Sequence, residues 1–355
     1  MYRHVMLVEM AFASALHWVP RACIVMRGPV GPHPVPEIES FLSDVALTMP
    51  PPALSSLVGL LMGSGEEVLT PGADATLHPL LVPLTRRPED GEVTGLLRWP
   101  AAGGGGSKMP VVRTYDGGRQ LELLADCTEH FVAKAAVDAD ASGAPDAAEL
   151  AKLAANAMGL TYEAGTARKF PGGAPGYLIT KVGPFLSAYK QLALKHAEGG
   201  SLEAALITCE RTQRSFQAWG HPYAFHSRLL ARVNRAEEAR DMARFALGLP
   251  LWTLGDDVAE LCGLAQTSTT ELATSLREKA DGKLSLEQKR AQNGMEQRTP
   301  AQIAKDRASY LLDLVVASPG EYSWEGVRAE LASLYRAAGM PSIATFVSSP
   351  TAGVN

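Results

Sequence analysis

The chain has 355 residues, of which 46% are hydrophobic. A chain of that size can bury about two ordinary hydrophobic cores, so roughly two domains are expected. There are 33 basic and 38 acidic residues, and the resulting net charge of -5 argues against broad electrostatic binding to the phosphates of a nucleic acid. We therefore expect no nucleic-acid partner.

The first elements predicted are an amphipathic helix over residues 2–18 and a short strand over 22–26. The apolar stretch 5–19 has some features of a secretory signal, but Glu9 places a charge inside it. The start also lacks the Ser- and Arg-rich composition of a transit peptide. Three prolines from Pro50 interrupt the longest uncharged run, so no transmembrane span is expected. We expect a soluble, cytoplasmic protein, with plastid or mitochondrial import left open.

Helix and strand patterns are mixed over residues 1–140, which indicates an α/β domain. The clearest unit is a hairpin, because Asp116-Gly117 readily takes the positive φ angles of a tight turn. Asp126 is the expected cap of the helix that follows it. The predicted helices are 34–48, 53–62 and 128–137, and the predicted strands are 77–84, 93–99, 111–115 and 119–124.

Two segments have the composition of linkers. Residues 101–108 contain four consecutive glycines but lack the Gly-Lys-Ser/Thr order of a phosphate-binding loop. Residues 138–146 are rich in Asp, Ala, Ser, Gly and Pro, and here we place the domain boundary. The predicted domains are a mixed α/β domain at 1–140, a linker with a Gly/Pro-rich loop at 141–185, and a helical domain at 186–355 with a charged insertion around 280–299.

The helical half repeats itself with a period of 34 residues. Tyr189 and Tyr223 are separated by that distance, and so are Ala205 and Ala239. Each unit consists of two helices joined by a short polar turn, with helices predicted at 186–197, 202–214, 222–232 and 237–247. A fixed period of this size is typical of stacked helical hairpins.

Period, layout and the small residues at the helix contacts resemble the tetratricopeptide repeat. A third, partial unit with the same spacing is expected at Leu331 to Ala344, three residues out of register. The resemblance covers about a third of the chain. It implies an all-α, right-handed superhelical domain of repeats. With the mixed patterns of residues 1–140, the predicted fold class is an α+β N-terminal domain followed by this helical-repeat domain.

In that family the first helix of each unit lines a concave groove that binds an extended peptide or a partner helix. Carried over by position, the groove residues are Lys190, Leu194, His221, Phe225, Arg228 and Arg232. Their positive charges would suit an acidic partner segment, although ordinary solvated charges explain them equally well. Leu194 and Phe225 replace the asparagines that grip chaperone tails in the family, so chaperone-tail binding is not expected.

The sequence offers no recognisable catalytic, cofactor or metal site. The four cysteines are Cys23, Cys127, Cys209 and Cys262, and we interpret them as reduced, buried thiols with no CxxC pair and no histidine at metal spacing. His221 and His226 lie about 140° apart on a helix, so they do not share a face. No catalytic residues, cofactors or metal ions are therefore expected.

These patterns favour a non-enzymatic adaptor or assembly factor that holds a partner protein through its repeats. A permanent structural subunit of a larger complex is the first alternative. An enzyme with an unrecognised site in residues 1–140 is the second. In the first alternative the N-terminal part docks onto the complex and the repeats act as a spacer.

Overall fold

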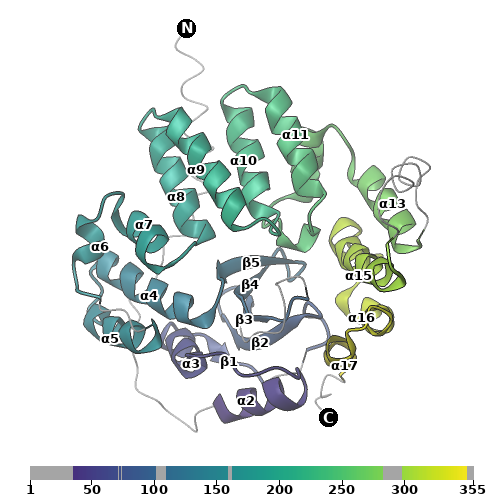
Figure 1. Cartoon of the computed structure of the whole chain (residues 1–355), viewed down its shortest axis with the longest axis horizontal. Coiled ribbons are helices and arrows are strands. Elements are labelled where there is room, and N and C mark those ends of the chain that lie inside the picture. The colour runs from purple at the N-terminus through teal and green to yellow at the C-terminus, as the bar shows by residue number, and fades with distance from the viewer. Residues whose placement is uncertain are drawn as a thin grey trace.

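A central antiparallel sheet is enclosed by an arc of helices that runs from α2 to α17 (Figure 1). The computed structural model describes residues 35–70, 72, 74–100, 109–158, 162–282 and 298–349. The helix predicted over 2–18, the strand over 22–26, the glycine-rich segment 101–108 and most of the charged insertion lie outside those ranges.

The sheet is a five-stranded meander in which each strand pairs antiparallel with the next. The predicted hairpin is confirmed, since Asp116 and Gly117 have φ angles of 55° and 64° and connect two paired strands. The strands are β1 (Glu67–Val68), β2 (Leu81–Arg86), β3 (Val93–Leu97), β4 (Val111–Tyr115) and β5 (Gln120–Ala125).

Both faces of the sheet are covered, because successive side chains of a strand point to opposite faces. In β4, Val111 packs into a core with the N-terminal helices, while Val112 packs into a second core with the C-terminal helices. Both side chains are fully buried. The sheet is therefore the middle layer of the molecule.

The N-terminal layer contains α2 (Val35–Asp44), α3 (Leu54–Gly63) and α4 (Thr128–Ser142). The chain remains helical beyond α4, where the sequence predicted a linker and loop. Residues 141–185 contain the end of α4, then α5 (Ala147–Met158), α6 (Thr166–Lys169), α7 (Gly173–Tyr177) and the π-helical turn η1 (Leu178–Val182).

Tertiary contacts explain why α4 extends past the predicted end at residue 137. Asp140 is 3% exposed, and its carboxylate accepts hydrogen bonds from the Tyr162 hydroxyl at 2.6 Å and the Gly165 N–H at 2.8 Å. The Asp140 carbonyl also accepts a hydrogen bond from the Arg168 Nε at 2.7 Å. These contacts outweigh the weak helix propensity of the polar composition.

Two helical hairpins follow, at positions that the 34-residue period predicted. They are α8 (Leu186–Glu198) with α9 (Leu202–Ser215), and α10 (His221–Arg232) with α11 (Ala236–Leu247). Small buried residues, including Ala193 and Ala205 of the first hairpin, let the helices approach closely. The regular pattern ends there, because the chain continues as the short 3₁₀ helix η2 (Leu251–Thr253), α12 (Val258–Ala265) and α13 (Thr269–Ala280).

The C-terminal helices turn back onto the sheet and close the arc against α2 (Figure 1). They are α15 (Pro300–Ala317), α16 (Trp324–Ala337) and α17 (Pro341–Ser348). The Phe41 ring of α2 meets the Phe346 ring of α17 edge to face at 6.4 Å. The Arg98 guanidinium joins the same contact, donating to the Ser342 carbonyl at 3.0 Å.

The predicted fold class, an α+β N-terminal part followed by an all-α part, is confirmed. A right-handed superhelix of repeats is not established, since the third hairpin, α16 with α17, packs against α2 and the β2 region instead of extending the first two. In the described residues, no helix is long and apolar enough to cross a bilayer.

Candidate protein-binding surfaces

The six predicted groove residues lie together on one side of α8 and α10, a surface that we call the α8–α10 face. On α10, His221, Phe225 and Arg228 are spaced four and three residues apart and therefore share a helix face, which Arg232 continues. The Lys190 Nζ of α8 lies 5.7 Å from the centroid of the Phe225 ring, a cation–π contact. Leu194 follows Lys190 by one helical turn and is half-buried.

Arg228 of this face forms two ion pairs. Its guanidinium forms ion pairs with Asp256 and, at 2.8 Å, with Glu260 at the start of α12. The Asp256 side chain is 11% exposed, and its burial raises the pKa of that carboxyl to about 6 although Arg228 opposes the shift. The Asp256 main chain is held by Gln120 of β5, whose Nε2 donates to the Asp256 carbonyl at 2.8 Å.

Acidic neighbours offset the basic character predicted for this face. Burial lowers the pKa of Lys190, while Glu122 of β5 and Asp256 act in the opposite direction. Glu122, Asp256 and Glu260 come from segments far from α8 and α10 in the sequence. No local pattern in the sequence could have placed them there.

His221 has a structural role on this face. Its Nδ1 lies 3.0 Å from the Leu254 carbonyl, to which it donates. Burial lowers the pKa of the His221 imidazole to about 4, so the ring is neutral at physiological pH. Gly255 packs closely against it, since a Cβ at that position would lie 2.8 Å from Nδ1.

A second candidate surface is an open groove on the α9 and α11 side of the same hairpins, which we call the α9–α11 groove. Its volume is about 550 Å³. Phe245 of α11 is 55% exposed, and its ring packs at a tilt of 36° against the Tyr223 ring, with the two centroids 4.7 Å apart. The lining residues are Glu210, Gln213, Arg214, Gln217, Tyr223 and Phe245. The tetratricopeptide resemblance predicted a groove on the first helix of each unit and did not predict this surface.

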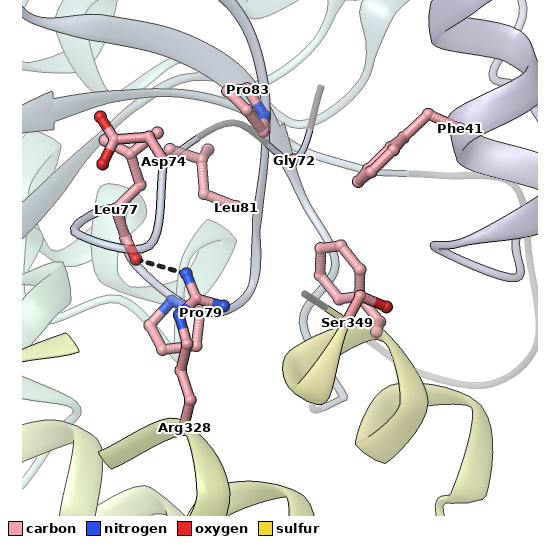
Figure 2. Close-up of a pocket in the computed structure, with 10 residues that line it drawn as sticks. Phe41, Gly72, Asp74, Leu77, Pro79, Leu81, Pro83, Arg328 and Ser349 are labelled. Atoms are coloured by element: carbon pink, nitrogen blue, oxygen red, sulfur yellow. Dashed lines mark hydrogen bonds between the residues drawn. The ribbon is translucent and has the colours of Figure 1, made fainter. Parts of the chain in front are cut away.

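A small pocket lies where α2, the segment before β2 and the end of α17 meet (Figure 2). Phe41 and Ser349 lie on one side of it, and on the other side the Arg328 guanidinium donates to the Leu77 carbonyl at 2.9 Å. Its volume of about 30 Å³ holds roughly two water molecules. A pocket of that size cannot enclose a cofactor.

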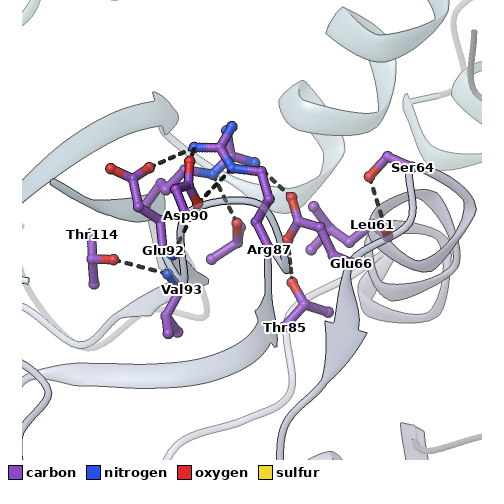
Figure 3. Close-up of polar contacts among 11 residues, drawn as sticks. Leu61, Ser64, Glu66, Thr85, Arg87, Asp90, Glu92, Val93 and Thr114 are labelled. Atoms are coloured by element: carbon purple, nitrogen blue, oxygen red, sulfur yellow. Dashed lines mark hydrogen bonds and ion pairs between the residues drawn. The ribbon is translucent and has the colours of Figure 1, made fainter. Parts of the chain in front are cut away.

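A buried polar network crosses the sheet near the end of α3 (Figure 3). The Arg113 guanidinium contacts the Glu66 carboxylate at 2.7 Å and the Thr94 hydroxyl at 3.1 Å, and the Thr85 hydroxyl donates to Glu66 at 2.6 Å. The Glu66 and Arg113 side chains are only 4% and 10% exposed. Because each charge is paired and hydrogen-bonded, the network fixes the position of α3 on the sheet.

A cluster of potential metal ligands, which the sequence did not lead us to expect, lies at the start of α4. Asp126, Cys127 and His130 place a carboxylate oxygen, a thiol sulfur and an imidazole nitrogen within 4.8 Å of one another. We had expected no histidine at metal spacing near the cysteines, but His130 follows Cys127 by three residues, on the first turn of α4. Asp126, predicted as the helix cap, contacts the His130 ring instead, and Cys127 occupies the cap position.

Family models match this chain in three consecutive parts. They are described as PAB N-terminal, at residues 36–176, PAB middle domain, at 186–268, and PAB C-terminal domain, at 278–350. The tetratricopeptide assignment was therefore wrong, although the two helical hairpins that suggested it are present. Helical hairpins with small residues at their contacts are shared by many helical folds, so the period alone could not separate the families.

The protein of Arabidopsis thaliana named Protein in chloroplast ATPase biogenesis, chloroplastic, is 33% identical over 311 residues. The matched region covers 87% of this chain and 89% of that relative. The relative's name is that of a biogenesis protein and not of an enzyme, in agreement with the non-enzymatic character that we expected. No solved structure matches. On the three domain matches and this relative together, the chain belongs to the PAB family.

Proposed function

We propose that this chain is a non-enzymatic assembly factor in the biogenesis of a chloroplast ATPase, where it holds a partner protein during assembly. The observation that carries the proposal is the similarity to the biogenesis protein, which extends over 87% of the chain and 89% of the relative. A match of that extent includes most of both the N-terminal part with its sheet and the helical part. The proposed location is accordingly the chloroplast.

The α8–α10 face is the surface that we propose for partner binding, with an acidic segment as the ligand. Arg228 is the central contact, because its two carboxylate partners differ in exposure. The Asp256 side chain is 11% exposed and the Glu260 side chain is 58% exposed. An exposed ion pair contributes only about 0–1 kcal/mol, so a carboxylate of the partner can replace Glu260 at little cost. Asp256 stays in place and keeps the guanidinium oriented.

Lys190 and Arg232 flank Arg228 along the same face and add positive charge on either side. The proposed assembly role rests on the similarity to the relative and not on this surface. The role and the binding surface can therefore be refuted separately. The predicted division into residues 1–140, 141–185 and 186–355 remains a proposal as well. Partner binding by the helical part is the feature of that division that matters for function.

Affinity purification of the full chain, expressed in its native cell, tests the proposal. We expect ATPase subunits to be recovered with the wild-type chain, and at least about tenfold less with a Lys190→Glu, Arg232→Glu double variant, since reversed charges repel an acidic segment. Arg228 is left unchanged because it holds α12. The matched control is Lys195→Glu with Arg211→Glu, an equal charge change at exposed positions of the first hairpin outside this face.

Each outcome has a clear meaning. Loss of ATPase subunits in the double variant alone supports both the function and the surface. Equal recovery in wild type and both variants would exclude the α8–α10 face. Absence of ATPase subunits from the wild-type sample would refute the assembly role. Permanent co-migration with the finished ATPase on native gels would instead identify a structural subunit.

A further inference from the structure

The Asp126, Cys127 and His130 cluster lies where β5 passes into α4, and none of its residues belongs to either candidate protein-binding surface. Asp126 follows the last residue of β5, Cys127 is the N-cap residue of α4, and His130 lies in the first helical turn. The candidate ligand atoms of the three side chains lie within 4.8 Å of one another. Carboxylate, thiolate and imidazole are together the ligands that Zn²⁺ takes in proteins.

The Cys127 thiol does not serve as a helix cap. Helix N-caps are normally Ser, Thr, Asp or Asn, whose side-chain oxygen accepts a backbone N–H. Cys127 occupies that position with extended backbone angles and makes no such hydrogen bond. It is a free cysteine, only 5% exposed.

The His130 ring is held in one orientation by the residues around it. The Asp126 carboxylate contacts Nδ1, and the ring lies 6.0 Å from the Phe185 ring. Gly183 covers another part of the ring, since a Cβ there would lie 2.5 Å from Cε1. Gly183 directly follows the π-helical turn η1, and π-helical turns occur frequently at functional sites.

We propose that Asp126, Cys127 and His130 form a Zn²⁺ site. Three protein ligands leave one tetrahedral position for water or for a group from a partner. A thiol and an imidazole are poor ligands for Mg²⁺ and Ca²⁺, which prefer oxygen. The site is independent of the assembly role, because none of its three residues lies on the α8–α10 face or in the α9–α11 groove.

Binding of the metal alone to the purified full chain, free of any affinity tag, tests the site. Competition with a chromophoric chelator gives the Zn²⁺ affinity, and the Co²⁺ spectrum reports whether a thiolate is bound. We expect one equivalent of Zn²⁺ and a thiolate-to-Co²⁺ charge-transfer band. Affinity should fall by about 100-fold in Cys127→Ser and His130→Gln, which lose a ligand, and by at least about tenfold in Asp126→Asn.

Matched controls separate ligand loss from unfolding. Cys209→Ser and Cys262→Ser remove buried thiols elsewhere and should leave the Zn²⁺ affinity unchanged. Serine is a good N-cap, so the Cys127→Ser chain should fold, and Zn²⁺ should raise the Tm of the wild-type chain but not of this variant. A wild-type chain without saturable Zn²⁺ binding would overturn the proposal. Wild-type affinity in Cys127→Ser and His130→Gln would do the same.

Discussion

At the centre of the sheet, Gly95 of β3 sits where a side chain cannot fit. A Cβ at this position would lie 2.3 Å from the Val82 carbonyl oxygen and 3.1 Å from the Pro83 Cα. Both atoms belong to the backbone of β2, which cannot move aside as the end of a side chain would. The register of β2 against β3 is irregular between Pro83 and Thr85, next to this close approach.

Replacement of Gly95 by alanine should therefore lower the free energy of unfolding by about 1–3 kcal/mol. Gly59 of α3 is the matched control, because nothing lies within 4 Å of the Cβ that alanine would add there. Gly59→Ala should stabilise the chain by about 0.5–1 kcal/mol through helix propensity. Denaturant titration measures both changes. Equal stability of Gly95→Ala and wild type would show that β2 can separate from β3 without penalty.

Among the elements, the short helix η2 is fixed to α15 by one buried carboxyl. The Leu251 N–H donates to the Asp313 Oδ1 at 2.7 Å, and Asp313 is 5% exposed. Burial raises the pKa of Asp313 to about 8. Because the group ionises at about 3.8 in the unfolded chain, the unfolded state gains an advantage as the pH rises.

The contribution of Asp313 to stability should accordingly be lost between about pH 4 and pH 8. Asn at this position keeps an oxygen acceptor for the Leu251 N–H but carries no charge. We expect Asp313→Asn to be close to wild type in stability at pH 4 and to be more stable by about 5 kcal/mol at pH 8, since the pKa shift of Asp313 is lost with its charge. Thermal unfolding across this range measures the difference. The same pH dependence in both chains would mean that Asp313 is already ionised in the folded state.

Elements with a strong local signal could be predicted from the sequence, and those held by distant contacts could not. The Asp116-Gly117 hairpin and helices α8 to α11 follow from turn chemistry and apolar periodicity. The extension of α4 depends on Tyr162 and Gly165, which bind Asp140 from 22 and 25 residues away. Asp256 is held at the α8–α10 face by a hydrogen bond from Gln120, which lies 136 residues earlier in the chain. The spacing of Cys127 and His130, by contrast, is a local feature of the sequence from which a metal site could have been predicted.

On the scale of the whole molecule, the sheet and the C-terminal helices share one core. Leu121 and Val112 of the sheet pack in the same cluster as residues of α15, α16 and α17. The Trp324 Nε1 of α16 donates to the Gly118 carbonyl in the β4–β5 turn at 2.8 Å. The contact between Phe41 and Phe346 joins the first described helix to the last. We therefore expect the described parts to unfold together.

Truncation of Phe346 tests this coupling. Phe346 is 6% exposed, so Phe346→Ala should lower the free energy of unfolding by about 3–5 kcal/mol. Phe245→Ala removes the same atoms from a ring that is 55% exposed and should change stability by less than about 1 kcal/mol. Far-ultraviolet circular dichroism and tryptophan fluorescence should report coincident transitions in each chain. Separate transitions in Phe346→Ala would indicate that α17 unfolds on its own.

The enclosure of the sheet has a consequence for how partners can be recognised. At one edge, β1 is only two residues long and α3 packs against it. At the other edge, β5 lies against η2 and α8. Within the described residues, neither outer strand offers the long, open row of backbone donors and acceptors that another chain needs to add a strand. We therefore expect the proposed partner to bind through side-chain contacts and not by adding a strand to the sheet. The same coverage protects the folded chain from edge-to-edge aggregation.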